Sequence, residues 1–578
     1  MDRQKLMRVA LGEEPADLVL KGGQVFAGFT GKFRVCDIAV SQGCIAGLGT
    51  YDGPCEVDLQ GKYVTPGFID AHVHIESSML TPNGFARTVV PRGTTTVVAD
   101  PHEIANVAGI EGIRYMMDEA AKIPLSVKFM LPSCVPATGL EDNGACLEAE
   151  DLRPLLEHPD VLGLGEMMDM AGVLAGDKAV WQKLALLQDS GLVDGHAPLL
   201  AEKALMGYGA AGIMSDHECV TPEEAELRLA AGMYLLIREG SAAHNLEALL
   251  PVITAENSMF CCFCTDDRHP GDLLSAGGIN AMVRQAVAWG IPVSRALQMA
   301  TVNTARYFGL RDCGVIAPGR RADLLVFDNL SDWEPVQVYT HGQLSAEQGQ
   351  PWGTQWPSQG QQVMPARLAE SVHMAAGEVF SLALPLAGIK ANVIELVPRQ
   401  LLTRRCFMTV PVKAGLAVAD PVKDILKLAV WERHKGTGRH GIGLVKGFGL
   451  QRGAIAQTIG HDSHNLIVIG ADDADMQLAM THLVACGGGV VIVDGGKVCE
   501  CLELPVGGLM TAQPAAQVAE QAKRMETLAY ALGVRPAYDP FLTLAFLSLP
   551  VIPELKLSDR GLVDVEAGRI IAIDENMN

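Results

Sequence analysis

The chain lacks a surplus of basic residues. It carries 45 Lys and Arg against 67 Asp and Glu, which gives a formal net charge of -22 at pH 7. An acidic balance of this size opposes binding to a polyanion. We therefore expect no nucleic-acid partner.

Long apolar runs and a leader are also missing. No uninterrupted apolar run approaches the roughly 20 residues that a membrane span needs, so the 49% hydrophobic content indicates packed cores and no membrane partner. The N-terminal sequence MDRQKLMRVALGEEPADLVL lacks the apolar core and the cleavage site of a signal peptide. The 14 cysteines are scattered without a regular disulfide framework. These features predict a soluble protein of the reducing cytoplasm.

Alternating patterns dominate what is present. Residues 17–65 contain short strand-like runs punctuated by glycine, the pattern of a small β unit. From Phe68 onward, eight strand-like runs alternate with amphipathic helical segments: FIDAHVH, TTTVVADPHE, LSVKFMLP, VLGLGEMMD, LVDGHAP, AGIMSDHE, MYLLIREGS and FCCFCTDD. This count predicts a (β/α)8 barrel of the TIM type, whose chemistry lies at the carboxyl ends of the strands.

The flanking segments predict the domain organisation. Residues 314–330, GVIAPGRRADLLVFDNL, return to β patterning, so we expect residues 1–65 and 311–343 to form one composite β-sandwich domain beside a barrel at 66–310. Residues 344–366 are rich in Gln, Gly and Pro and predict a linker or surface loop. Residues 367–578 alternate strands with helical patterns and predict a C-terminal α+β domain. The predicted fold class is α/β.

Six metal-ligand side chains lie at the ends of the predicted barrel strands. His72 and His74 are two apart on one strand, so both imidazoles point the same way. The other four follow later strands; they are Glu166, His196, His217 and Asp266. A single His or Asp at a strand end more often satisfies a loop or caps a helix. Six together at one end of a barrel predict a site for two divalent cations with a shared carboxylate.

The motifs that carry these residues resemble the amidohydrolase superfamily and, within it, the bacterial adenine deaminase family. They are GFIDAHVH, GLGEMMD, DGHAP, SDHE and CTDDRHP, joined by ADPHEIANVAG and by LVKGFGLQRGAIAQTIGHDSHNLIVIG in the last third of the chain. The resemblance covers essentially the whole sequence. It implies hydrolytic deamination of adenine to hypoxanthine and ammonia, a purine-salvage reaction, with Mn²⁺ or Fe²⁺ as the cations; nitrogen and oxygen ligands also suit Zn²⁺.

The mechanism implied is attack on adenine by a hydroxide that bridges the two cations, which lower the pKa of bound water. By resemblance, Asp266 is a ligand that also takes the hydroxide proton, and Glu103 resembles the proton shuttle of the family. The alternative for Glu103 is an acidic residue favoured at a helix N-terminus. Because the run VLGLGE ends in Glu166, we expect a glutamate bridge in place of the carboxylated lysine of many binuclear relatives.

Four polar residues are candidates for substrate binding: Glu218, Arg238, Ser241 and His464. His461 and His464 either line the active site or terminate a strand in a domain that serves assembly. Family members tend to carry His and Asp where this chain has Gly278 and Asn280, which bears on the preferred purine.

Three other interpretations compete with this one. The motif His74-Ile75-Glu76 with Cys261 to Cys264 mimics the zinc nucleobase deaminases of another fold, but no proline precedes Cys261 and nearly two hundred residues separate the halves. A metal-free binding module should have lost some of the six ligands, and none is missing. The remaining competitor is another amidohydrolase activity, such as deamination of a different base or hydrolysis of a cyclic amide. Composite β units and added domains also favour a homo-oligomer, a dimer or higher.

Overall fold

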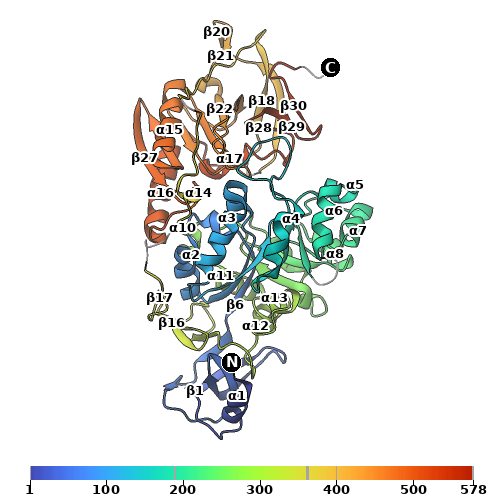
Figure 1. Ribbon diagram of the computed structural model, residues 1–578, viewed down its shortest axis with the longest axis vertical. Helices are drawn as coiled ribbons and strands as arrows, with labels where there is room; N and C mark the ends of the chain where they lie inside the picture. Colours follow the sequence, from blue (N-terminus) through green and yellow to red (C-terminus); the bar gives the residue numbers. More distant parts are fainter. Residues whose placement is uncertain (1, 188–190, 359–363, 376, 399, 576–578) are drawn as a thin grey trace. The chain divides into compact units, whose positions relative to one another are not determined.

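The computed structural model describes residues 2–187, 191–358, 364–375, 377–398 and 400–575 (Figure 1). The chain divides into two compact units. The first comprises Met1–Asp100, Met116–Ser133 and Ala149–Gly360, and the second comprises Pro101–Tyr115, Cys134–Glu148 and Gln361–Asn578. None of the helices in these described ranges is long and apolar enough to cross a membrane.

A nine-stranded sheet in the first unit joins the start of the chain to a segment near residue 330. Strand β5 pairs antiparallel with β14, so that Pro66 lies opposite Leu324. Buried apolar side chains such as Val25, Ile38 and Val64 form the core under this sheet, and removing them from water is its main stabilising contribution. Helix α1 (Arg3–Ala10) precedes the sheet. The strands of the sheet are β1 (Leu18–Ala27), β2 (Lys32–Ser41), β3 (Cys44–Gly49), β4 (Glu56–Asp58), β5 (Tyr63–Pro66), β14 (Leu324–Phe327), β15 (Gln337–Thr340), β16 (Gln343–Glu347) and β17 (Gln350–Pro351).

Part of the segment predicted as a linker is strand. Residues 344–347 belong to β16, and β17 pairs with it antiparallel, opposing Gln350 to Glu347. Residues 359–363 of the same segment lie outside the described residues. The domain boundaries given by the sequence remain predictions.

The α/β region of the first unit contains a strand in each of the eight predicted runs. The strands are β6 (Phe68–Val73), β7 (Thr94–Ala99), β8 (Ser126–Leu131), β9 (Val161–Met167), β10 (Leu192–Gly195), β11 (Ser215–Asp216), β12 (Tyr234–Arg238) and β13 (Cys261–Cys264). The helices between and after them are α2 (Pro82–Val89), α3 (His102–Ala120), α4 (Ala149–Leu152), α5 (Met170–Ala175), α6 (Lys178–Leu184), α7 (Glu202–Ala210), α8 (Pro222–Ala230), α9 (Leu246–Leu249), α10 (Pro270–Ser275), α11 (Ile279–Trp289), α12 (Val293–Met299) and α13 (Val302–Tyr307). Alternation of strands and helices gives parallel strands, and every strand pair here is parallel.

The closed ring predicted for these strands differs from what the described residues form. Their ladders make a five-stranded sheet, in the order β10-β9-β8-β7-β6, and a three-stranded sheet, in the order β11-β12-β13. Strand β10 has four residues and β11 has two, which leaves little backbone for a ladder between them. The two segments are joined by single bonds: Met214 N donates to Val193 O at 3.2 Å, and Gly195 N donates to Ser215 Oγ at 3.3 Å.

The second unit is built on an eight-stranded sheet. Its order is β19-β18-β23-β22-β25-β24-β26-β27. These strands are β18 (Lys390–Leu396), β19 (Thr403–Thr409), β22 (Ile425–Trp431), β23 (His440–Lys446), β24 (Ala454–Gln457), β25 (Leu466–Gly470), β26 (Gly489–Asp494) and β27 (Lys497–Glu503). The unit also contains β20 (Val412–Lys413), β21 (Leu416–Ala417), β28 (Leu555–Ser558), β29 (Gly561–Asp564), β30 (Arg569–Ile571), α14 (Ala366–Ala369), α15 (Asp473–Cys486), α16 (Ala515–Ala531) and α17 (Pro540–Phe546).

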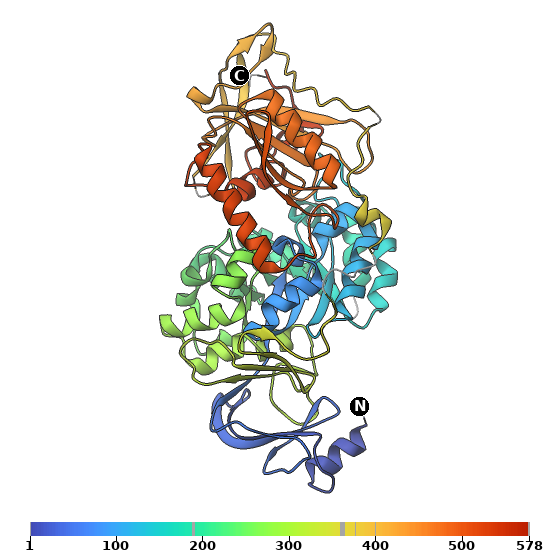
Figure 2. The ribbon, with the colours of Figure 1, turned by 90° about the vertical axis from the view of Figure 1, so that its left-hand side faces the viewer.

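Helix α15 covers one face of this sheet and is the orange helix that faces the viewer in Figure 2. Asp472 caps its first turn by accepting from Ala474 N and Asp475 N, and Gly487 ends it in the left-handed region with φ 78°. Its side chains Met476, Met480 and Leu483 pack with Trp431 and the inner residues of β24 and β26 in one buried cluster. The unit therefore has a core of its own.

Candidate metal centre

Six side chains converge at the carboxyl ends of the strands in the first unit. His72 is in β6 and His74 follows it; Glu166 is in β9; His196 follows β10, His217 follows β11, and Asp266 comes two residues after β13. All are buried except His196, which is partly exposed. Parallel strands present their carboxyl ends at one edge, which brings residues far apart in sequence together.

Glu166 stands between two pairs of imidazoles. Its Oε1 lies 3.2 Å from His74 Nε2 and 3.9 Å from His72 Nε2. Its Oε2 lies 2.7 Å from His196 Nδ1 and 3.2 Å from His217 Nε2. One carboxylate oxygen therefore serves each histidine pair, which is the arrangement of a carboxylate that bridges two cations.

The first histidine pair shares a second carboxylate. His72 Nε2 and His74 Nε2 are 3.1 Å apart, and Asp266 Oδ1 lies 3.6 Å from the first and 3.1 Å from the second. Ring nitrogens and carboxylate oxygens at these separations can ligate one cation together. The ligand atoms of His72, His74 and Asp266 all lie within 4.8 Å of one another, as do those of His72, Glu166 and His217. The residues present thus fit two divalent cations.

Asp100 orients two of these ligands. Its backbone carbonyl lies 2.9 Å from His74 Nδ1; because a carbonyl only accepts, that nitrogen carries the hydrogen and Nε2 keeps its lone pair for a metal. Its side-chain Oδ2 accepts from Glu166 N at 3.0 Å. Sequence reasoning missed this role, although Asp100 precedes Pro101 at the end of a predicted strand, where such a residue could have been suspected.

Asp70 was also missed. It lies two residues before His72, and its carboxylate accepts from Thr265 N at 3.0 Å and from Thr265 Oγ1 at 2.6 Å. Thr265 is the neighbour of Asp266, so this contact holds β6 and the end of β13 in register. The signal was present in the motif FIDAHVH, where a charged residue occupies an otherwise apolar strand.

The electrostatics of the cluster favour cations. Burial raises the pKa of a carboxyl group, yet contacts with His196, His217 and His74 outweigh burial and hold the pKa of Glu166 well below its usual value. At Asp266, His74 and Arg238 outweigh burial in the same direction, and its pKa is well below the usual value. Although burial opposes it, the contact with Glu166 raises the pKa of His217 to about 9. The site therefore gathers positive charge, which a metal can supply in place of protons.

Arg238 and Glu218, two of the residues predicted to bind substrate, contact each other and the cluster. Arg238 donates to Asp266 Oδ2 at 2.9 Å and to both oxygens of Glu218. Glu218 Oε1 lies 3.6 Å from His196 Nδ1 and 3.5 Å from His217 Nε2. Arg238 thus holds the outer oxygen of a metal-ligand carboxylate. A contact of either residue with substrate remains a prediction.

Ser241, a third predicted substrate contact, is engaged in its own loop. Its hydroxyl donates to Asp272 Oδ2 at 2.5 Å and accepts from His269 N at 2.8 Å. These bonds tie the segment after β12 to the start of α10 (Pro270–Ser275). Its role toward substrate also remains a prediction.

Glu103 and the two C-terminal histidines lie together in the second unit. His461 Nδ1 is 2.8 Å from Glu103 Oε1, and His464 Nε2 contacts Glu103 Oε2. Gly460 N donates to His464 Nδ1 at 3.3 Å, so Nε2 carries the ring hydrogen and donates to the carboxylate. Burial opposes ionisation, but His461 and His464 outweigh it and hold the pKa of Glu103 well below its usual value. The structure therefore assigns His461 and His464 to this glutamate.

The structure places Gly278 and Asn280 at the start of α11. Asn280 is fully buried near the start of α11 (Ile279–Trp289), its Oδ1 accepts from Gly278 N at 3.0 Å, and its Nδ2 donates to Glu334 Oε1 at 3.0 Å. These bonds fix the loop before α11 against the segment between β14 and β15. Asn280 therefore stabilises this loop.

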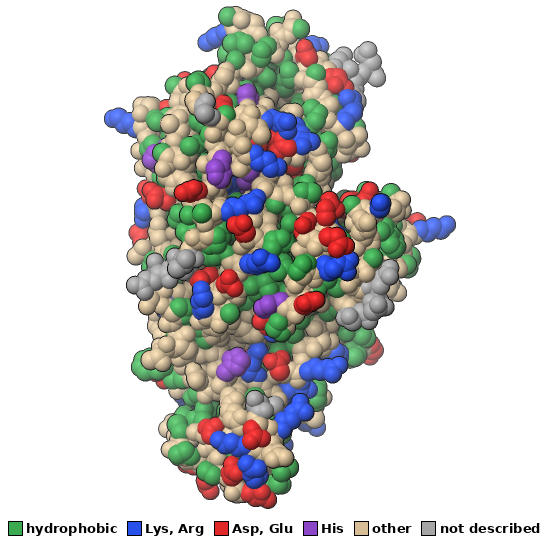
Figure 3. Space-filling view, viewed as in Figure 1, with side chains coloured by type: hydrophobic (Ala, Val, Ile, Leu, Met, Phe, Trp, Pro, Cys, Tyr) green, Lys and Arg blue, Asp and Glu red, His purple; other side chains and the backbone are tan. Residues whose placement is uncertain are grey.

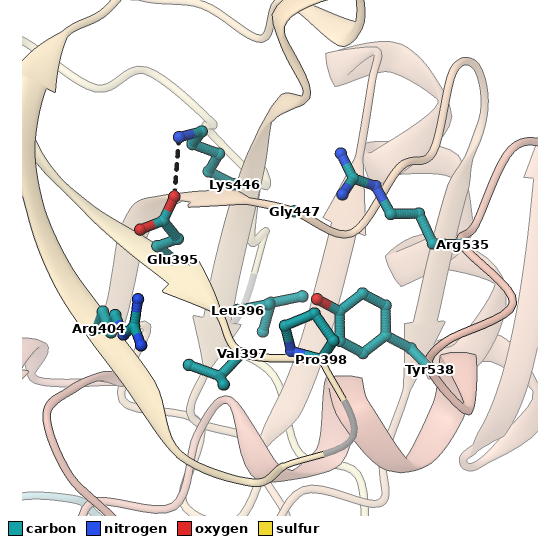
Figure 4. Close-up of a pocket in the computed structure, with 9 residues that line it drawn as sticks. All are labelled: Glu395, Leu396, Val397, Pro398, Arg404, Lys446, Gly447, Arg535 and Tyr538. Carbon is teal, nitrogen blue, oxygen red and sulfur yellow. Dashed lines mark hydrogen bonds and ion pairs between the residues drawn. The ribbon is translucent and has the colours of Figure 1, made fainter.

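A cavity of about 390 Å³ lies elsewhere, in the second unit (Figure 4). It is lined by both charged and apolar residues: Glu395, Leu396, Val397, Pro398, Arg404, Lys446, Gly447, Arg535 and Tyr538. Lys446 Nζ pairs with Glu395 at 2.8 Å on its wall. None of these residues belongs to the metal cluster, which remains the candidate active site.

The chain is similar to known proteins over nearly its whole length. Residues 63–350 match the amidohydrolase family, and residues 400–569 match the adenine deaminase C-terminal domain. Adenine deaminase 2 of Carboxydothermus hydrogenoformans is 50% identical over 98% of this chain and 99% of its own length. The adenine deaminase of Desulfatibacillum aliphaticivorans is 47% identical over 99% of both chains. A crystal structure described as an adenine deaminase aligns with 57% of this chain and 99% of its own, with 19% identity and a TM-score of 0.43.

Proposed function

Because this chain belongs to the adenine deaminase family of the amidohydrolases, we propose that it hydrolyses adenine to hypoxanthine and ammonia in purine salvage. The observation that carries the proposal is Glu166, whose two carboxylate oxygens each face a pair of imidazoles. Full-length relatives with the same activity in their names support the choice of adenine.

We propose two cations at this centre. His72, His74 and Asp266 with Glu166 Oε1 would hold one, and His196 and His217 with Glu166 Oε2 would hold the other. When bound, the metals would supply Lewis acidity that makes water a nucleophile at neutral pH. The ligands are all nitrogen and oxygen, which suit Mn²⁺, Fe²⁺ and Zn²⁺ alike. The choice of Mn²⁺ or Fe²⁺ over Zn²⁺ rests on the family resemblance.

The protein's own residues would handle the protons. In the reaction the oxygen of water bonds to C6 of adenine, the bond from C6 to the amino nitrogen breaks, and protons must reach the ring nitrogen N1 and the leaving amine. Asp266 is proposed to accept the proton of the attacking water, since Arg238 keeps one of its oxygens hydrogen-bonded and its other oxygen lies among the ligands.

Glu103 is proposed to deliver protons to the purine. It follows Asp100, the residue that orients His74 and Glu166, by three positions, so at most about 11 Å of chain separates their Cα atoms. The imidazole of His464 donates to its carboxylate and His461 lies beside it, which gives a carboxyl group that can exchange protons within a buried hydrogen-bonded set.

The arrangement of the eight strands leads to a further proposal. We propose that the eight strands complete a (β/α)8 barrel: His74 N donates to Asp266 O at 3.2 Å between β6 and the end of β13, and Met214 N donates to Val193 O at 3.2 Å beside β10.

We also propose that the protein is a homo-oligomer and lies in the cytoplasm. The cytoplasmic location is proposed because all 14 cysteines are free thiols. On the face in Figure 3, Lys and Arg are interspersed with Asp and Glu, which agrees with a small-molecule substrate.

The test is turnover by Mn²⁺-loaded protein, followed as ammonia release from adenine, guanine and cytosine and as hypoxanthine formation from N6-substituted adenines. Adenine should be the best substrate, and metal analysis should find about two cations per chain in the first unit's centre. No turnover of adenine would refute the proposal. Faster turnover of another base, or ring opening of a cyclic amide in a parallel assay, would favour the competing amidohydrolase activity. The matched control is Asp312→Asn, which alters an acidic side chain paired with Arg321 and not one of the six ligands.

A further inference from the structure

A second group of metal-ligand side chains lies in the C-terminal unit. His482 and Cys486 are on α15, Cys501 is on β27, and all three are partly buried. Their ligand atoms all lie within 4.8 Å of one another. Figure 1 shows α15 beside β27 at the edge of the eight-stranded sheet. No residue of this group takes part in the centre described above.

The fold places these residues together for local reasons. His482 and Cys486 are four apart on a helix, so their side chains lie on one face. The chain then turns through Gly487, Gly488 and Gly489, which all have positive φ, into β26, the strand that pairs with β27. Cys501 lies opposite Val491 in that pairing, which brings its thiol under the last turn of α15.

The surroundings favour a cation. Cys486 is the last residue of α15, where the helix dipole presents partial negative charge. Glu503 lies two residues after Cys501 and therefore on the same side of β27. Its charge raises the pKa of both thiols, so it adds negative potential to the position that the three ligands surround.

The two thiols lie close together at the end of the helix. Their sulfur atoms are within 4.8 Å of each other. Cys486 Sγ also donates to Leu483 O at 3.5 Å and to Gly488 O at 3.7 Å, which holds this thiol at the last turn of α15. A metal that binds both sulfurs would replace their protons.

We propose that His482, Cys486 and Cys501 bind a thiophilic divalent cation, of which Zn²⁺ is the probe. Two thiolates and one imidazole are three of the four ligands of a tetrahedral zinc site. The fourth position is open to water or to Glu503. Sulfur ligands separate this site in chemistry from the six-residue centre, whose ligands are only nitrogen and oxygen. The site ties the end of α15 to the edge strand β27.

The test is cobalt and zinc loading of the full chain after removal of metals by a chelator. Co²⁺ should produce a thiolate-to-cobalt charge-transfer absorption in the near ultraviolet, which the nitrogen and oxygen centre cannot give. Zinc analysis should find about three cations per wild-type chain and about two per chain of the Cys486→Ser, Cys501→Ser variant. That variant should lose the charge-transfer absorption. His482→Ala should bind Zn²⁺ more weakly and keep the absorption at saturating Co²⁺.

The matched control is Cys499→Ser. Cys499 is exposed on the same strand and outside the group, so its loss should leave both the absorption and the zinc content unchanged. The proposal is overturned if the wild-type absorption is absent, if it persists in the double serine variant, or if Cys499→Ser removes it. It is also overturned if the untreated thiols prove to be a disulfide, seen as a mass lower by two hydrogens, and reduction does not give zinc binding.

Discussion

Arg238 allows a sharp test of how the metal centre is held. It was predicted to bind substrate, but it donates to Asp266 Oδ2 at 2.9 Å, to Glu218, and through Nε to Asn245 Oδ1 at 3.1 Å. Arg238→Met removes all these donors and keeps the volume of the side chain. We expect the variant to bind metal more weakly because Asp266 is no longer held with its other oxygen among the histidines.

The size of the effect follows from the contact. A hydrogen bond between charged groups contributes about 1.5–3 kcal/mol, and 1.4 kcal/mol is a factor of ten in an equilibrium constant. Metal binding should therefore weaken by roughly 10–100-fold, the range seen when partners of metal ligands are removed. Arg238→Met would also leave the largely buried carboxylate of Glu218 without its partner, which lowers stability. The double variant Glu218→Gln, Arg238→Met removes that unpaired charge, so it separates loss of stability from loss of metal binding.

The assay is titration of metal-free protein with Mn²⁺, followed by steady-state kinetics with adenine at saturating metal. Kd for Mn²⁺ should rise in Arg238→Met and recover in part in Arg238→Lys, which keeps the charge but not the planar fork. Asn245→Ala, which leaves the contact with Asp266 intact, should bind metal as wild type does. The reasoning is refuted if Kd for Mn²⁺ is unchanged in Arg238→Met while KM for adenine rises tenfold or more, because Arg238 would then act on substrate.

Three further results are expected. Glu166→Gln cannot bridge two cations, so the metal content and the rate of deamination should both fall. The rate should fall by more than roughly 100-fold, the upper limit for changes to residues beyond the ligands. Metal analysis that finds two tightly held cations in this variant would contradict the bridge. Glu103→Gln should slow deamination about 10²–10⁴-fold and leave the metal content unchanged. His464→Asn should shift the pH profile of kcat. If His464 only stabilised the fold, its loss would leave that profile unchanged. Burial lowers the pKa of Lys556 to about 7, whereas a lysine in the unfolded chain has a pKa of about 10. Between these two pH values the unfolded state binds more protons, so the stability of the wild-type protein relative to Lys556→Met should rise by up to about 1.4 kcal/mol per pH unit. Melting temperatures of both proteins at pH 7, 8 and 9 check this, and a difference between them that does not shrink as the pH rises would disprove it.

The convergence of the candidate ligands could be predicted from the sequence because alternation on a strand and the common edge of parallel strands are geometric rules that need no tertiary detail. His72 and His74 follow from the first rule, and the gathering of Glu166, His217 and Asp266 with them follows from the second. The eight strands were predictable for the same reason. The gap between β10 and β11 was not, since it depends on how few residues each strand has before its polar end, and a strand boundary has no sharp signal in sequence.

The supporting contacts were beyond sequence reasoning for a different cause. Asp70, Asp100 and Arg238 act through partners 195, 66 and 28 residues away, and the type of a residue does not tell which distant group it will meet. Asn280 is a further case, because its buried bonds to Gly278 and Glu334 appear only once α11 is placed against the sheet.

The supporting contacts also offset the buried negative charge of the cluster. Glu166 and Asp266 are two buried carboxylates close to the same imidazole, His74, and buried charges are costly unless they are paired. Arg238 donates to Asp266 from one side. Against the effect of burial, contacts with Asp266 and Glu166 raise the pKa of His74 and of His217, so protonated imidazoles offset more of the negative charge. The candidate ligands lie in or soon after strands, and a cation that replaced those protons would meet side chains already held in place.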